Sequence, residues 1–248
     1  MPDEEVEHAR LLRQTDDLQN ALLNSISHNV RTPLAAILGS LSTLQDEYGS
    51  LEDSIKRELI DNARAGAERL NRLLGNLLDM SRLEAGALQI RRDLCDVQDV
   101  IGAALEQLGS VAARRTIEVI IPPNLPFVRM DFVLIVQVIV NLLNNALKYS
   151  AECSPVTLET IVLDGTLEVR VLDDGYGIPA QDLTKVFEKF NRAARSGETG
   201  GIGLGLSICK GLIEAHKGNI WAQRREPRGT TVAFCLPLGC GAGGAGGD

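Results

Sequence analysis

The sequence has few cysteines, and none is placed to build a cross-link or a metal site. The 248 residues include five cysteines, an odd number, at positions 95, 153, 209, 235 and 240, and no two form a CxxC pair. Isolated cysteines speak against a disulfide framework and a cysteine zinc site, and they indicate a reducing compartment.

Long apolar runs and an excess of positive charge are also missing. The most apolar stretch, Phe132 to Leu143, is interrupted by Gln137 and Asn141 and is too short to span a bilayer. No signal-peptide pattern opens the chain. We therefore expect a cytoplasmic segment without membrane contact, and any membrane anchor would belong to a longer parent protein. The net charge of −8 argues against nucleic acid as a partner.

Two amphipathic helices account for the first third of the chain. Apolar residues recur with helical spacing from Leu11 to Leu44 and again from Ile55 to Leu77, with Gly49 marking a turn between them. Such a helical hairpin leaves both apolar stripes uncovered. We therefore expect residues 1–86 to form a homodimer in which two hairpins pair into a four-helix bundle.

Residues 87–238 alternate between strand and helix patterns, and Asp164-Gly165 is a strong hairpin turn. Adjacent hairpin strands with intervening helices favour an α+β fold, with a two-layer α/β sandwich as this second domain. The glycine-rich tail, residues 239–248, is expected to be disordered. Strands are predicted at 88–94, 116–122, 156–163, 166–174 and 230–238, and helices at 97–112, 131–150 and 203–218.

His28 lies in the first amphipathic helix but away from its apolar stripe. At about 100° per residue, it is about 160° from Val30 and about 200° from Ile26. Pro33 lacks an N–H group and should bend the helix just after the histidine. An exposed imidazole beside a helix defect is placed to react. The alternative is an ordinary surface histidine.

Asn141 and Asn145 share one face of the predicted helix at 131–150 and interrupt its apolar pattern. The helix continues past both, which disfavours a capping role and favours a polar site. An amide oxygen suits Mg²⁺ that bridges to phosphates. Lys148, less than one turn beyond Asn145, is placed to meet a phosphate, and Tyr149 to lie against a planar ring.

Asp173 ends a predicted strand and is followed by Gly175 and Gly177. Its carboxylate could accept a hydrogen bond from an exocyclic amine, and the glycines allow the backbone to approach a ligand closely. A simple turn is the alternative interpretation.

Glycines at 201, 203 and 205 precede and open another predicted helix. Free backbone N–H groups at a helix N-terminus can bind phosphate. The segment is not a Walker A loop, because no GK[ST] follows, and it is no dinucleotide fingerprint, because no strand runs directly into it. The polar stretch at 191–201 has the composition of a nucleotide-covering lid.

Five segments, in this order, together resemble the catalytic core of two-component sensor histidine kinases. Residues 25–34 (SISHNVRTPL) resemble the phospho-acceptor H-box, 141–150 the N-box, 173–179 (DDGYGIP) the G1 box, 186–192 (VFEKFNR) the F-box and 201–218 the G2 box. Segments around the N-box and EAHKGNIWA also resemble the branch that controls Kdp-type potassium uptake.

The resemblance implies an enzyme that binds ATP and Mg²⁺ in a Bergerat-fold domain. It implies that His28 accepts the γ-phosphoryl group and passes it to an aspartate on the receiver domain of a response regulator. The implied roles are Mg²⁺ binding by Asn145 with Asn141; phosphate contact by Lys148; adenine contact by Tyr149 and Asp173; shaping of the pocket and lid by Gly175, Gly177, Gly201, Gly203 and Gly205; and lid anchoring by Phe187 and Phe190.

The chain departs from the family pattern directly after the histidine, where Asn29 replaces the usual acid. Asparagine can accept a hydrogen bond but cannot take the proton, and general-base help is worth roughly 10²–10⁴-fold. Thr32 shares the helix face of His28 and is a candidate for positioning water in phosphatase activity. The alternative function is a degenerate, ATP-binding regulatory scaffold with little phosphotransfer. A chaperone- or topoisomerase-like ATPase is disfavoured, because neither requires His28.

Overall fold

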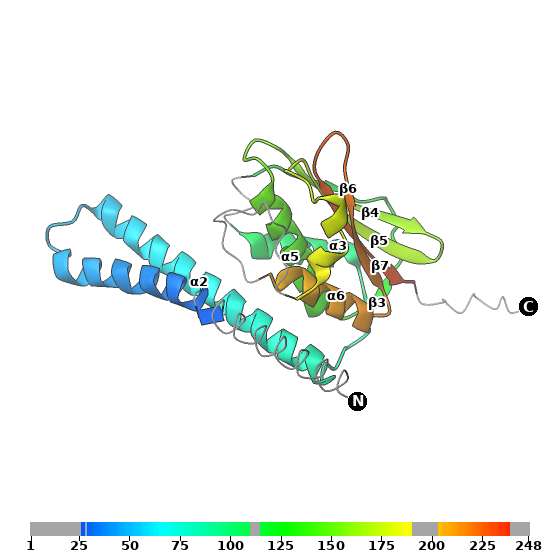
Figure 1. The fold of residues 1–248 in the computed structure, drawn as a ribbon, viewed down its shortest axis with the longest axis horizontal. Coiled ribbons are helices and arrows are strands. Elements are labelled where there is room, and N and C mark those ends of the chain that lie inside the picture. Colours follow the sequence, from blue (N-terminus) through cyan, green and yellow to red (C-terminus); the bar gives the residue numbers. More distant parts are fainter. Residues whose placement is uncertain (1–25, 28, 110–114, 190–202, 239–248) are drawn as a thin grey trace, which may run out of the picture. The chain divides into compact units, whose positions relative to one another are not determined.

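The computed structural model describes residues 26–27, 29–109, 115–189 and 203–238, and these form two compact units (Figure 1). The first unit extends to Asp79 and the second begins at Met80. The division lies inside one long helix, α2 (Asp53–Glu84). The predicted domain boundary after residue 86 stays a prediction. The predicted disordered tail at 239–248 lies outside the described residues.

The first unit is a helical hairpin. Residues 29–47 are helical, residues 48–52 form the turn, and α2 follows. The helices approach closely at Gly66, where an added Cβ would lie 2.8 Å from Cγ1 of Ile37 and 3.1 Å from the carbonyl oxygen of Pro33. Even so, the hairpin leaves large apolar side chains exposed along both helices: Leu34, Leu38, Leu41, Ile55, Ile60, Leu74 and Leu78.

The second unit is built on a five-stranded mixed sheet in the order β2-β4-β5-β7-β6. Its helices α3, α5 and α6 lie on one face of this sheet (Figure 1). The predicted α+β fold and two-layer arrangement are confirmed. The sheet contains β2 (Ile117–Ile120), β4 (Val156–Leu163), β5 (Thr166–Asp173), β6 (Asn219–Arg224) and β7 (Thr230–Pro237), and the helices are α3 (Val97–Leu108), α5 (Phe132–Tyr149) and α6 (Gly205–Ala215).

The β4–β5 hairpin shows why the predicted pattern led to this sheet. Its turn residues Asp164 and Gly165 have φ values of +49° and +73°, which suit aspartate and glycine in a tight hairpin. Along β5, the side chains that face the helices are buried and apolar: Leu167, Val169 and Val171. The resulting core also contains Phe234 and the apolar face of α5.

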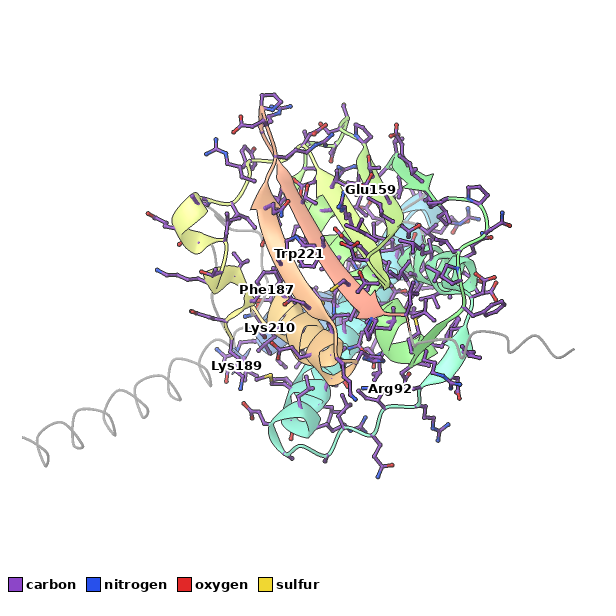
Figure 2. The ribbon with its side chains drawn as sticks, turned by 90° about the vertical axis from the view of Figure 1, so that its right-hand side faces the viewer. Arg92, Glu159, Phe187, Lys189, Lys210 and Trp221 are labelled. Atoms are coloured by element: carbon purple, nitrogen blue, oxygen red, sulfur yellow. The ribbon has the colours of Figure 1, made fainter. Side chains whose placement is uncertain are left out.

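The opposite face of the sheet carries polar groups (Figure 2). Arg170 forms ion pairs with Glu168 at 2.5 Å and with Glu159 at 3.3 Å. The strand register places Trp221 on this face as well, because it lies opposite Ala233, which lies opposite Arg170. A face that carries charged residues accounts for the two layers, since no third layer is needed to cover it.

Two strands of the structure were not predicted from the sequence, and one predicted strand is longer than the strand observed. The strand predicted at 88–94 is only β1 (Asp93–Cys95), which pairs with the unpredicted β3 (Val128–Met130) in a separate two-stranded sheet. β6 was also missed. Segments of three residues carry no periodicity, and β6 pairs only with β7 at the edge of the large sheet, where one flank has no partner strand.

Among the described helices, α5 alone is long and apolar enough to cross a membrane by length and composition. It packs against α3, α6, β4 and β5, and half of its most apolar window is buried inside the unit. Its apolar side chains therefore serve as the core of a folded domain.

His216 joins the end of α6 to the start of α5. Its Nδ1–H donates to the carbonyl oxygen of Leu212 at 2.7 Å, and its Nε2 accepts the backbone N–H of Asp131 at 3.0 Å. Burial lowers the pKa of His216 and Arg92 lowers it further, whereas the Leu212 carbonyl and the Asp131 carboxylate act in the opposite direction. The neutral ring is the form that satisfies both hydrogen bonds.

The contribution of His216 to the stability of the second unit should therefore fall as pH drops below about 6.5, the ordinary histidine pKa. Below this pH His216 is protonated in the unfolded chain but stays neutral in the folded protein. Its contribution to the free energy of unfolding is therefore complete above this pH and decreases below it, by at most about 1.4 kcal/mol per pH unit. Urea unfolding followed by Trp221, the single tryptophan, measures this unit. His216→Gln should flatten the pH slope and His28→Gln should retain it. An unchanged slope in His216→Gln would contradict this account.

Candidate functional site

Four segments of the second unit meet around the predicted site residues. They are the polar face of α5, the loop that follows β5, the short helix η2 (Lys185–Phe187) and the start of α6. α5 packs against both α6 and β5, and α6 packs against η2. The structure thus brings together segments that lie up to about 60 residues apart in the chain.

α5 divides its residues between core and site. Leu142, Leu143, Ala146 and Leu147 are buried in the core, whereas Asn141, Asn145 and Lys148 are half-buried on the other side and Tyr149 is exposed. The Nζ atom of Lys148 lies 5.0 Å from the centroid of the Tyr149 ring. The last two turns of α5 therefore present two amides, an ammonium group and an aromatic ring.

Asn141 carries a buried amide nitrogen without a well-formed hydrogen bond among the described residues, although its side chain interacts with the thiol of Cys209 and lowers the pKa of that thiol, which burial raises. A thiol is a weak acceptor, so the amide keeps the capacity for a stronger partner. Gly205, the first residue of α6, lies close by, since a Cβ added there would be 3.9 Å from Oδ1 of Asn141. An amide side chain beside a helix N-terminus suits a ligand that carries phosphates.

Asp173 is a buried carboxylate at the end of β5, only 6% exposed. Its Oδ1 accepts the backbone N–H of Gly175 at 2.8 Å. Burial raises the pKa of Asp173, and the neighbouring Asp174 adds to this, although the backbone N–H groups of Gly175 and Thr230 and the charge of Arg225 lower it. A carboxylate has about four acceptor positions, so the two backbone N–H groups leave Asp173 capacity to accept a hydrogen bond from a ligand.

Gly175 holds the loop after β5 against the end of α5. A Cβ at this position would collide with the carbonyl oxygen of Tyr149 and lie 2.7 Å from Oδ1 of Asp173. Gly177, with a φ of +73°, continues the same loop. The absence of a side chain at Gly175 is therefore what allows Asp173 and the last turn of α5 to be neighbours.

The β6–β7 hairpin supports this loop through contacts that no sequence pattern predicts. A Cβ at Gly229 would collide with the carbonyl oxygen of Asp173, and Arg225 pairs with Asp174 at 2.6 Å. These contacts join residues more than 50 positions apart. Local periodicity carries no signal for such contacts.

The remaining predicted positions divide into two groups. Phe187 is buried in η2 beside α6 (Figure 2), and Gly203, with a φ of +74°, lies just before α6. In the first unit, Asn29 is half-buried and Thr32 exposed, both in helical conformation. Three predicted residues, His28, Phe190 and Gly201, lie outside the described residues.

The donor set fits a magnesium ion bound together with phosphates. Within the described part of the chain, no group of three or more His, Cys, Asp and Glu residues is arranged to hold a metal. Mg²⁺ keeps several waters and needs few protein oxygens when phosphates are present. The amide oxygens of Asn141 and Asn145, on one face of α5, match that requirement.

Comparison with known families identifies both units. Residues 10–86 match the His Kinase A (phospho-acceptor) domain, and residues 130–239 match the histidine kinase-, DNA gyrase B- and HSP90-like ATPase family. The chain belongs to the two-component sensor histidine kinases. It has the two domains of their catalytic core, as the sequence resemblance predicted.

Similar proteins include the sensor protein KdpD of Clostridium acetobutylicum, 34% identical over 94% of this chain, and that of Escherichia coli K12, 31% identical over 93%. The chain spans about a quarter (26%) of the length of each. Among solved structures, the histidine kinase AdeS of Acinetobacter baumannii matches with a TM-score of 0.63 and 22% identity, over 86% of this chain and 98% of that one. The histidine kinase ThkA, solved in complex with the response regulator protein TrrA, matches with a TM-score of 0.62 and 21% identity, over 94% of this chain and 66% of that one.

Substituting Gly175 by alanine should destabilise the second unit by about 1–3 kcal/mol, because the new Cβ overpacks the junction between the loop and α5. Gly102→Ala in α3 is the matched control, since nothing lies within 4 Å of a Cβ there. That variant should gain about 0.5–1 kcal/mol of helix propensity. Urea unfolding read at Trp221 compares the two, and equal stabilities would show that the junction tolerates a side chain.

Proposed function

We propose that this chain binds ATP with Mg²⁺ in its second unit and transfers the γ-phosphoryl group to His28. The observation that carries the proposal is the buried carboxylate of Asp173, held by backbone N–H groups beside the end of α5. An acceptor in that position suits an adenine amino group. The phospho-acceptor domain match over residues 10–86 supports His28 as the destination.

Each site residue that the structure describes then has a role that its position supports. Asp173 accepts a hydrogen bond from the adenine amino group, and Tyr149 packs on the adenine ring. Lys148 contacts the phosphates. Gly175 and Gly177 let the backbone approach the base.

The start of α6 and η2 would form the phosphate end of the site. Gly203 and Gly205 would offer backbone N–H groups to phosphate, and the family resemblance gives Gly201 the same role. Phe187 and Phe190 anchor the lid. Asn145, with help from Asn141, binds the Mg²⁺, which when bound neutralises charge on the phosphates.

In the transfer itself, a ring nitrogen of His28 attacks the γ-phosphorus and the bond to the β–γ bridging oxygen breaks, releasing ADP. The other ring nitrogen loses its proton to water, because Asn29 cannot accept it. The phosphoryl group then passes to an aspartate on the receiver domain of a response regulator. The complex of the related fold ThkA with a response regulator protein supports a partner of this class.

The first unit is proposed to act as a homodimer. The exposed apolar side chains along both helices, such as Leu38 and Leu78, need a cover, and a second hairpin provides one in a four-helix bundle. We place this core in the cytoplasm, as part of a longer sensor protein, in keeping with the length of its KdpD relatives.

Incubation with γ-labelled ATP and Mg²⁺ should give an acid-labile label on the parent chain and none on His28→Gln. A phosphohistidine is acid-labile, so the pair of results separates the kinase from other ATPases. Nucleotide binding by the parent without any label would instead support a regulatory scaffold with little phosphotransfer. Failure of the parent to bind nucleotide would overturn the whole proposal.

Restoring the acid by Asn29→Asp should raise the initial rate of labelling, by up to the roughly 10²–10⁴-fold that general-base help contributes. The KM for ATP should stay the same, since residue 29 belongs to the acceptor helix. Asn24→Asp, in the same sequence segment, controls for added negative charge. A rate in Asn29→Asp equal to that of the parent would show that proton removal does not limit transfer.

A further inference from the structure

The end of α5 is held by a side chain from outside the helix. Arg115, two residues before β2, donates from Nη1 to the carbonyl oxygen of Leu147 at 2.8 Å. Its Nη2 donates to Oγ of Ser150 and to the carbonyl oxygen of Ala151, both at 2.7 Å. One guanidinium group thus binds three acceptors within the five residues that close α5.

This arrangement matches what a helix C-terminus lacks. The last carbonyls of a helix have no partners within it, and they form the negative end of the helix dipole. A planar guanidinium can bind several such acceptors at once, which a lysine cannot do with the same geometry. The backbone beside Arg115 is itself anchored, because the carbonyl oxygen of Thr116 accepts the N–H of Val156 at 3.0 Å.

Burying the guanidinium group of Arg115 costs free energy. Its Nε is buried and has no hydrogen-bond partner among the described residues. A buried unpaired donor costs about 1–3 kcal/mol, which offsets part of what the three hydrogen bonds contribute. The three hydrogen bonds from a charged group, at about 1.5–3 kcal/mol each, exceed this cost, so Arg115 stabilises the end of α5 on balance.

The clamped turn is also the turn that carries the site. Lys148 and Tyr149 lie between the two acceptors Leu147 and Ser150, and the Tyr149 carbonyl abuts Gly175. Gly175 in turn donates its N–H to Asp173. Contacts therefore run without interruption from Arg115, through the last turn of α5, to the buried carboxylate.

We propose that Arg115 is a positioning residue for the nucleotide site. It sets the last turn of α5 against the Gly175 loop and so controls the affinity for the adenine end of the nucleotide. This rests on the proposed function of the site as an ATP site. The hydrogen bonds of the Arg115 side chain all go to the end of α5, so its loss should act on binding and leave the rate of transfer at saturating ATP nearly intact.

The chain offers a matched control in Arg92 (Figure 2). Its Nη2 donates to the carbonyl oxygen of Ala215 at 2.8 Å, so it is also an arginine at a helix C-terminus. The helix in that case is α6, which contributes its opposite end, at Gly205, to the site. Arg92→Met and Arg115→Met therefore remove the same kind of interaction, but only one of them borders the Gly175 loop.

The test measures ADP binding to the full chain by calorimetry and the KM for ATP in the labelling assay. Arg115→Met should raise both the dissociation constant for ADP and the KM at least tenfold, with the saturating rate changed less than threefold. Arg115→Lys should recover part of the affinity. Arg92→Met should bind ADP within twofold of the parent. Trp221 fluorescence checks that each variant is folded.

Three results would overturn the inference: unchanged ADP affinity in Arg115→Met, a fall in the saturating rate without a change in KM, or an equal loss of affinity in Arg92→Met. If Arg115→Met does not fold, the ADP affinity of Arg115→Lys tests the inference instead. An affinity equal to that of the parent would show that the planar guanidinium group is not needed. A parent chain that fails to bind ADP would refute the ATP site itself. If the parent chain binds ADP and Arg115→Met binds it with the same affinity, only the proposed role of Arg115 is refuted.

Discussion

The second unit depends on keeping one buried carboxylate, that of Asp173, at the end of an interior strand. Burying an acid is unfavourable, and the raised pKa of Asp173 expresses that cost. The folded protein binds this proton more tightly than the unfolded chain, so ionisation costs stability as pH rises through the folded-state pKa. Only surrounding structure that supplies N–H donors and tolerates a close backbone approach can keep the group there. Gly175, Thr230 and Gly229 meet those two needs.

α5 shows how the same helix serves stability and function. Its buried face supplies much of the hydrophobic core, while its other face presents Asn141, Asn145 and Lys148. The core side contributes favourable burial, and the site side carries the buried amide of Asn141, whose partner is no stronger than the thiol of Cys209 and which therefore costs free energy. Because both faces belong to one rigid rod, packing of the core also fixes the spacing of the polar groups. Site geometry is therefore inherited from the hydrophobic core.

What the sequence predicted and what it missed follow from the range of the interactions. Some features depend only on neighbours in the chain and could therefore be predicted from the sequence. They include the spacing of Asn141 and Asn145 and the turn at Asp164-Gly165. β3 and β6 are held by pairing with distant strands. Likewise Arg115 reaches residues more than 30 positions away, and Arg225 more than 50. The residues proposed to carry ligand chemistry stand in local sequence motifs, whereas the residues that hold them in place reach them through long-range contacts that no local pattern predicts.

Separate parts of the sequence specify phosphate donation and phosphate acceptance, so their defects have different kinetic signatures. Asp173, Gly175 and the end of α5 all belong to the second unit, so the proposed function assigns changes there to nucleotide affinity. Asn29 and Thr32 belong to the first, and the proposed function assigns changes there to the acceptor after nucleotide has bound. The replacement of an acid by Asn29 removes a base but also removes negative charge that would repel the phosphates. The first effect lowers the rate at saturating ATP, and the second favours the approach of the phosphates to His28. Measurements of affinity alone would therefore miss the chemistry of residue 29, and the saturating rate is the quantity that reports it.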